Sequence, residues 1–381
     1  MLSANRFGVP EELTLHGFAP FFKDFINPGW DGQFYYQISN DILALRDTPN
    51  HIDSDAYRYQ RIGFPLLVSV LGNVSFLEWI SPTFYLLNYF LLTLIAVAMG
   101  SALLHQRQIS PYLILLWALF TGTQLCLQNG LIDAAADSFL ILALFCSSYS
   151  LLFTVLFFTM AALTKEIYVI FLFIFVVLCA VRHISANGVN IRDLIISNRY
   201  SFLGLCVWCT WQLFVTLRFG HAPSSQSYDN FSHVPLGGLA MRVAAAQTGL
   251  AGYGIRWADG IVYFNYETVL LVIYFIFLGI FLLNAIRSLL SADSEHVPWS
   301  SFGPLEALLI GSLLLGISYL FLGPAVLTGY ENFSRTLSIF ILCSVLCMGK
   351  YKHFRSVFTL VSLFFCFICF NIMFFRDRLV A

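Results

Sequence analysis

The chain has 381 residues, of which 59% are hydrophobic and 11% are charged, and its formal net charge is −1. Soluble proteins carry about 25% charged residues, so this composition excludes an ordinary soluble domain. The near-neutral charge also argues against a nucleic-acid partner, which would require a basic stripe. Continuous apolar runs of about 20 residues, with no alternation of polar residues, predict an all-α polytopic membrane protein rather than a β-barrel.

Residues 1–80 are expected to form an extracytoplasmic or juxtamembrane segment ahead of a membrane domain at residues 81–381. Residues 1–29 contain no apolar run long enough to span a bilayer. Residues 32–45 predict a short amphipathic helix, and residues 48–55 predict a polar turn that ends it. The apolar side of that helix is expected to carry Phe34, Ile38, Ile42 and Leu45.

Residues 62–80 are apolar but poorly suited to cross a bilayer. Pro65, Gly72, Asn73 and Glu78 interrupt them, which predicts a juxtamembrane or re-entrant helix. Better candidates for spans follow, giving about ten transmembrane helices near residues 83–104, 111–128, 131–147, 151–164, 167–182, 200–218, 262–286, 304–323, 334–349 and 356–375. A glycine-rich outer loop is expected at residues 219–260.

The distribution of Lys and Arg gives a preferred topology. If residues 62–80 do not cross and the N-terminal segment is extracytoplasmic, the cytoplasmic loops collect eight basic residues: Arg107, Arg182, Arg192, Arg199, Arg287, Lys350, Lys352 and Arg355. Arg376 and Arg378 disagree with this assignment. The same topology gathers on the outer face several charged residues that lie near membrane helices, where charge is costly and usually functional: Asp31, Asp133, Lys165, Glu166, Glu331 and Arg335.

The polar stretch from Trp30 to Pro65 holds the candidate catalytic residue. Asp31 lies between a tryptophan and a glycine, where a carboxylate can act as the general base for an acceptor hydroxyl. The structural alternative is a helix-capping aspartate. The residues that follow Asp31 are candidates for sugar contacts: Gln33, Tyr35 and Tyr36.

Two arginines and two aspartates of the same stretch suggest phosphate chemistry. Arg58 and Arg61 are three residues apart, so that both guanidiniums can grip one phosphate, although snorkelling to the membrane surface explains them equally well. Asp53 and Asp55 are weak candidates for a metal site, and a divalent cation is therefore a candidate cofactor without a certain ligand set.

Three further charged pairs are candidate substrate-binding residues. Asp133 and Asp137 lie one helical turn apart, and Asp133 is also a candidate helix cap. Lys165 and Glu166 interrupt a long apolar stretch and are either part of the site or a self-paired break between helices. Glu331 and Arg335 are four residues apart at the outer start of a span, where an intrahelical ion pair is the simpler explanation.

The cysteines and the glycine patterns add no further chemistry. All nine cysteines lie in apolar runs, where the two pairs spaced by two residues, Cys206/Cys209 and Cys366/Cys369, are interpreted as packing residues. No P-loop, nucleophile-elbow, zincin or Rossmann pattern is present in the sequence, so soluble-nucleotide chemistry has no support.

The motif Trp30–Ile38, the sequence Tyr57-Arg58-Tyr59-Gln60-Arg61-Ile62 and Pro65 resemble the first outer loop of GT-C-fold membrane glycosyltransferases. Bacterial members similar to the mannosyltransferases of GPI-anchor assembly are the nearest in appearance. Residues 163–166 and Arg335 also look like recurring features of that family. The chain departs from the pattern of that family in two respects. Family members normally have a membrane span before this loop, which residues 1–29 do not show. Many members also have paired acidic residues at the motif, where this chain has Asp31 alone.

The resemblance implies an inverting transferase that moves a sugar from a polyprenyl-phosphate donor to an acceptor on the extracytoplasmic face of a bacterial inner membrane. It places Asp31 at the catalytic position. The expected partners are this lipid-linked donor, membrane lipids and a candidate membrane-protein partner. The alternative is a non-catalytic transporter, flippase or assembly partner for a polysaccharide or lipid-linked oligosaccharide.

Overall fold

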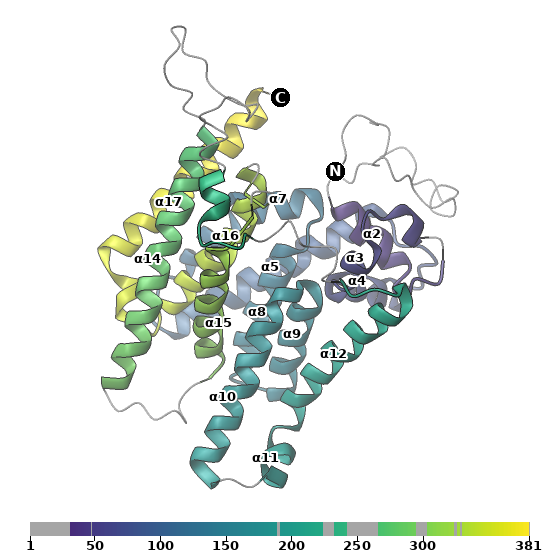
Figure 1. The fold of residues 1–381 in the computed structure, drawn as a ribbon, viewed down its shortest axis with the longest axis horizontal. Helices are drawn as coiled ribbons and strands as arrows, with labels where there is room; N and C mark the ends of the chain where they lie inside the picture. Colours follow the sequence, from purple (N-terminus) through teal and green to yellow (C-terminus); the bar gives the residue numbers. More distant parts are fainter. Residues whose placement is uncertain are drawn as a thin grey trace. The chain divides into compact units, whose positions relative to one another are not determined.

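The computed structural model describes residues 31–46, 48–188, 191–223, 232–241, 266–294, 303–323, 326–327 and 330–380. The regular secondary structure of these ranges is helical (Figure 1). The chain divides into two compact units. Unit 1 comprises residues 1–102, 124–227 and 299–307, and unit 2 comprises residues 103–123, 228–298 and 308–381.

Unit 1 is built around α9, which contacts α4, α8, α10 and α12. Its 14 residues, Leu151–Thr164, begin after Ser150, whose side chain caps the helix by accepting a hydrogen bond from the Phe153 N–H. The other elements assigned here are α2 (Gly32–Asn40), η3 (Thr48–His51), α3 (Asp55–Tyr59), α4 (Gly63–Val74), α5 (Pro82–Gln106), α7 (Thr121–Asn129), α8 (Asp133–Cys146), η5 (Glu166–Tyr168), α10 (Val169–Asn187), α11 (Ile191–Ser197) and α12 (Arg199–Phe219).

Glycines allow two of these helices to approach α9 closely. A Cβ added to Gly63 of α4 would lie 2.4 Å from the Met160 carbonyl oxygen. A Cβ added to Gly204 of α12 would lie 2.6 Å from the Thr159 hydroxyl. Small residues at such contacts are the usual means by which membrane helices pack, since lipid supplies no hydrophobic force between them.

Unit 2 is organised around α16 (Tyr330–Cys347), which contacts η4 (Pro111–Ile114), α6 (Leu115–Ala118) and α14 (Tyr266–Ser294). The ring centroids of Phe281 on α14 and Phe340 on α16 are 5.1 Å apart in an edge-on arrangement. The remaining helices are α15 (Pro304–Tyr319), η9 (Lys352–Arg355) and α17 (Val357–Val380), of which η9 and α17 contact α14.

Each of the ten predicted spans coincides with helical residues, but the number of spans is not confirmed. Four helical segments of the described chain are long and apolar enough to cross a membrane: Pro82–Gln106, Glu166–Asn187, Arg199–Phe219 and Val269–Leu290. A fifth exists if Pro111–Ala118 and Thr121–Asn129, which are bent by 60°, form one broken span. Several other predicted spans are shorter helices, such as α8 and α9 with 14 residues each.

Two segments were predicted to form short helices at the membrane surface, residues 32–45 and residues 62–80, and the structure describes both. The predicted amphipathic helix ends at Asn40, and every residue from Gly32 to Ser39 is buried, because the helix packs against α3 and α4 instead of lying on a surface. Leu45, expected on its apolar side, is 76% exposed. The 12 residues of α4 extend about 18 Å, less than the roughly 30 Å of a bilayer core.

Candidate functional site

One end of unit 1 gathers charged side chains from α3, α8 and η5 and from the segments that precede α2, α3, α4 and η5. We call this set the charge cluster, and it consists of Asp31, Asp53, Arg58, Arg61, Asp133, Lys165 and Glu166. All but Asp53, which was expected only as a weak metal ligand, are predicted site residues. The fold therefore joins residues that are up to 105 positions apart in the sequence.

Arg58 is the centre of the cluster. Its Nε and Nη2 donate to the two carboxylate oxygens of Asp53 at 2.9 and 2.8 Å. Its Nη1 lies 2.7 Å from Asp31 Oδ2, and its Nη2 donates to Asp31 Oδ1 at 3.0 Å. The side chain is 8% exposed. Burial opposes the guanidinium charge, but Asp31, the Tyr35 hydroxyl and Asp53 outweigh it and hold the pKa of Arg58 well above its usual range.

Arg61 forms the second bidentate pair. Its Nε and Nη2 each donate to a carboxylate oxygen of Glu166 at 2.5 Å. Its Nη1 donates to the Tyr35 hydroxyl at 3.1 Å, and Arg58 Nη1 donates to the same hydroxyl at 3.4 Å. Tyr35 thus connects the two arginines, and it is buried, with 1% exposure.

The break between α9 and η5 supplies Lys165, the cation of the third pair, and Glu166, the anion of the second. Lys165 has an extended backbone, and its Nζ donates to Asp133 Oδ1 at 2.7 Å. Glu166 pairs with Arg61, so the two neighbours each bind a residue distant in sequence, which the interpretation as a self-paired break did not foresee. Asp137, fully buried on α8, accepts a hydrogen bond from the Tyr168 hydroxyl at 2.6 Å.

The cations of the cluster are more deeply buried than three of its carboxylates, Asp31, Asp53 and Glu166. The side chains of Arg58 and Arg61 are 8% and 13% exposed, while that of Asp31 is 39% exposed. A guanidinium has five N–H donors, and all five of Arg58 are engaged by Asp31, Asp53 and Tyr35. The predicted phosphate clamp therefore requires an incoming phosphate to replace a carboxylate on one of the arginines.

Buried amides on α2 lie next to the cluster in sequence. The side chains of Gln33 and Gln37 are 1% and 0% exposed, and neither has a hydrogen-bond partner for its oxygen or nitrogen among the described residues. Buried unpaired polar groups are uncommon and costly in proteins. Gln37 was not predicted, although its spacing of four residues from Gln33 places both amides on one face of α2. Tyr36 is buried and packs edge-on against Tyr85 at 6.0 Å.

The other predicted site residues either lie apart from the charge cluster or are not among the residues that the structure describes. Asp55 Oδ1 lies 3.3 Å from His221 Nε2, while Asp53 pairs with Arg58. No group of three His, Cys, Asp or Glu residues that could hold a metal occurs in the part of the chain that is described. The Glu331 side chain and residues 224–231 and 242–260 of the predicted outer loop lie outside the described residues.

Arg335 belongs to unit 2, and its Nη2 donates to Asn332 Oδ1 at 2.9 Å. The two units are described separately, so its predicted place beside Asp31 stays a prediction. The nine cysteines form no disulfide among the residues described.

Sequence reasoning did not identify Tyr57 and Tyr168 as partners of Arg61 and Lys165, or His221 as the partner of Asp55. The contacts of Tyr168 and His221 join distant parts of unit 1, whereas Tyr57 and Arg61 are four residues apart. The only signal available was the number of tyrosines near the arginines.

Fold and site together define a helical protein with candidate membrane spans and a partly exposed ion-pair cluster at one end of unit 1. Comparison of the chain with protein-family models, with curated proteins and with solved structures finds no match.

Proposed function

We propose that the protein is a membrane glycosyltransferase that moves a sugar from a polyprenyl-phosphate donor to an acceptor hydroxyl on the extracytoplasmic face. The observation that carries this proposal is the position of Asp31, which is 39% exposed while its partner Arg58 is buried. A general base must be accessible to the acceptor hydroxyl, and Asp31 meets this condition.

In the proposed reaction, Asp31 accepts the proton of the acceptor hydroxyl. The hydroxyl oxygen attacks the anomeric carbon of the sugar, the new C–O bond forms on the face opposite the phosphate, and the bond between that carbon and the phosphate oxygen breaks. The polyprenyl phosphate leaves as an anion. Arg58 acts as a positioning residue, because it fixes both oxygens of Asp31.

The donor phosphate has a candidate place on Arg61. The same planar fork that binds Glu166 through two N–H groups also fits a phosphate. Exchange of Glu166 for phosphate would keep both hydrogen bonds and release the carboxylate to solvent, which it already reaches with 28% exposure. This exchange gives Arg61 the role in donor binding that the sequence suggested.

The extracytoplasmic location is supported by the two ends of unit 1. The charge cluster lies at the end formed by α2, α3 and the start of α10, whereas α11 lies at the other end (Figure 1). Near α11 the chain carries Arg182, Arg192 and Arg199. The 19 residues of α10 separate the ends by about 28 Å, close to the thickness of a bilayer core. Basic residues favour the cytoplasmic side.

Cysteine labelling tests this topology. In a protein without its native cysteines, Ser54→Cys at the cluster end should react with a membrane-impermeant maleimide added from outside. Ser185→Cys, exposed near the end of α10, should react only after the membrane is opened. Labelling of both positions from one side would contradict the proposed arrangement of unit 1 in the bilayer.

Activity is tested by the release of polyprenyl phosphate. Mass spectrometry of lipid that copurifies with the protein would identify the donor, and a panel of polyprenyl-phosphate hexoses would then be supplied with purified protein. Asp31→Asn should lower release of polyprenyl phosphate about 10²–10⁴-fold, the contribution of a general base. Asp193→Asn, on α11, is the matched control and should retain the rate.

Retained activity in a folded Asp31→Asn protein would remove Asp31 from the mechanism. If the wild type releases no polyprenyl phosphate but moves a lipid-linked sugar across proteoliposome membranes, the protein is a transporter and the transferase proposal is wrong.

A further inference from the structure

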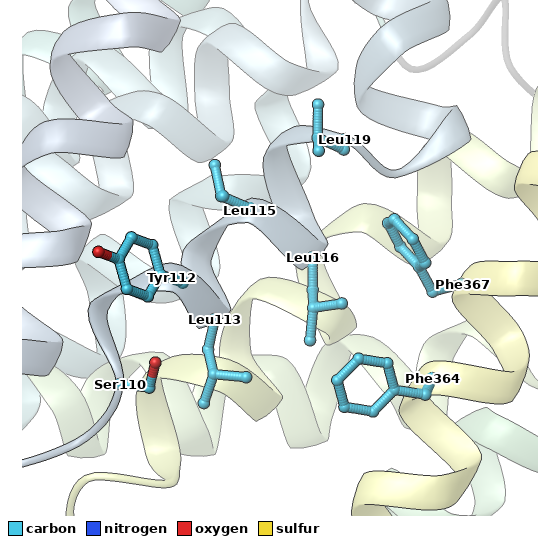
Figure 2. Close-up of a pocket in the computed structure, with 8 residues that line it drawn as sticks. All are labelled: Ser110, Tyr112, Leu113, Leu115, Leu116, Leu119, Phe364 and Phe367. Carbon is cyan, nitrogen blue, oxygen red and sulfur yellow. The ribbon is translucent and has the colours of Figure 1, made fainter.

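Unit 2 contains an apolar groove that the proposed reaction does not use. Its volume is about 260 Å³, and it lies between the segment of η4 and α6 on one side and α17 on the other (Figure 2). Figure 2 shows the side chains of Leu113, Leu116 and Phe364 turned toward one another along the groove. The complete lining is Ser110, Tyr112, Leu113, Leu115, Leu116, Leu119, Phe364 and Phe367.

The groove opens to the outer surface of unit 2 and not into its core. Leu115, Leu119 and Phe364 are 39%, 52% and 43% exposed. Leu115 lies in Pro111–Ala118, and Leu119 directly follows this segment. Pro111–Ala118 is half of a bent helix pair that is apolar enough to form a broken span. In a bilayer, such a surface faces lipid acyl chains.

Each wall of the groove begins a few residues after an arginine. Arg107 precedes Ser110 by three residues, and Arg355 precedes the start of α17 at Val357 by two. Arg107 Nη1 donates to the Leu346 carbonyl at 3.1 Å, and Arg355 Nη2 donates to the Gly349 carbonyl at 2.9 Å. Both arginines therefore bind carbonyls at or just beyond the end of α16, which holds them close to each other.

Two lysines add positive charge to the residues that precede α17. Lys350 and Lys352 are exposed, and Lys350 Nζ lies 5.9 Å from the centroid of the Tyr351 ring. Residues 103–123 and 349–370 contain no Asp or Glu. The groove therefore has an apolar body and, where its two walls begin, a segment with positive charge and no carboxylate. That combination is complementary to a lipid with an anionic headgroup.

We propose that this surface binds an anionic phospholipid, with one acyl chain in the groove and the phosphate near Lys350 and Lys352. The volume of 260 Å³ is below the range of pockets that enclose whole small molecules, and it fits part of a single acyl chain. The site lies in the loops that the sequence predicts on the cytoplasmic side, where anionic lipids attract basic segments. It lies in unit 2 and is independent of the transferase proposal.

Competition between lipids tests the site. Purified protein is equilibrated with phosphatidylglycerol and phosphatidylcholine of identical acyl chains, and native mass spectrometry counts the bound lipid. The wild type should prefer phosphatidylglycerol. Combined replacement of Lys350→Gln and Lys352→Gln should reduce this preference about tenfold, since each basic residue near the headgroup contributes to binding. Combined replacement of Lys350→Arg and Lys352→Arg, which keeps both charges, should retain it.

A second variant tests the groove itself. Leu116→Trp places a larger side chain between the walls and should reduce the binding of both lipids. The matched control is the combination Arg182→Gln and Arg192→Gln in unit 1, which removes the same charge and should leave the preference unchanged.

Equal binding of the two lipids by the wild type, or an unchanged preference in the lysine variant, would overturn the proposal. Tighter binding of undecaprenyl phosphate than of phosphatidylglycerol would also overturn it, because the surface would then recognise a carrier lipid. A lipid-free thermal midpoint equal to that of the wild type shows that each variant is folded.

Discussion

α2 and α12 of unit 1 show opposite relations between sequence and burial. The nine residues of α2 include two glutamines, a serine and an asparagine, and all but Asn40 are buried. The 21 residues of α12 are more apolar, yet the buried ones are Ser201, Gly204 and Val215. Leu203, Leu213 and Leu217 of α12 are 55%, 58% and 75% exposed.

The contrast follows from a surrounding that is apolar instead of aqueous. In water, large apolar side chains drive burial, so the more apolar helix would be the buried one. In lipid, that force between helices is absent, and small or polar residues make the contacts. Polar α2 is accordingly covered by other helices, and α12 turns its small residues toward α9 and its leucines outward.

The largest effect on this contrast is expected from Arg58→Ala, which removes a cation that donates to the Tyr35 hydroxyl of α2. The change leaves Asp31 and Asp53 without their shared guanidinium, and loss of one partner of a buried ion pair costs about 3–5 kcal/mol of stability. The low end applies because Asp31 is partly exposed. Thermal unfolding in detergent measures the loss.

The control for this charge change is Arg182→Ala, whose side chain is exposed on α10. Its stability should stay within about 0.5 kcal/mol of the wild type. Equal midpoints for the two arginine variants would mean that the cluster does not support the packing of α2.

A smaller loss is expected when α2 is forced away from its neighbour. A Cβ added at Gly32 would lie 1.8 Å from the Asn129 carbonyl oxygen, so Gly32→Ala should cost about 1–3 kcal/mol through overpacking. Gly279→Ala is the matched control, because nothing lies within 4 Å of its added Cβ on α14. That control should be neutral or stabilising by up to about 1 kcal/mol, since alanine favours helix. Similar shifts in both variants would contradict the close approach.

The smallest effect concerns the attachment of α12 to α3. The indole N–H of Trp211 donates to the Tyr59 carbonyl at 2.9 Å. Trp211→Phe removes this hydrogen bond and should lower stability by about 1 kcal/mol. The indole N–H of Trp208 has no partner among the residues described, so Trp208→Phe should cost less. A larger loss at Trp208 than at Trp211 would show that packing, and not the hydrogen bond, determines the effect of these changes.

Helix positions were predictable because they depend on local sequence. The predicted span at residues 151–164 has the same bounds as α9, between a capping Ser150 and the charged pair that follows Thr164. The interruptions at Pro65, Gly72, Asn73 and Glu78 also indicated that residues 62–80 would make a poor span, and α4 has 12 residues. These features need no knowledge of neighbouring helices.

The sequence by itself determined the helical, membrane-like class of the protein and the concentration of charged and aromatic residues between Trp30 and Pro65. Only the tertiary structure decided the pairings: Arg58 with Asp31 and Asp53, and Arg61 with Glu166. It also decided that α2 is covered on all sides. The physical reason is that apolar length and helix breakers act within a few residues, whereas an ion pair forms between whichever opposite charges the packed helices bring within about 4 Å.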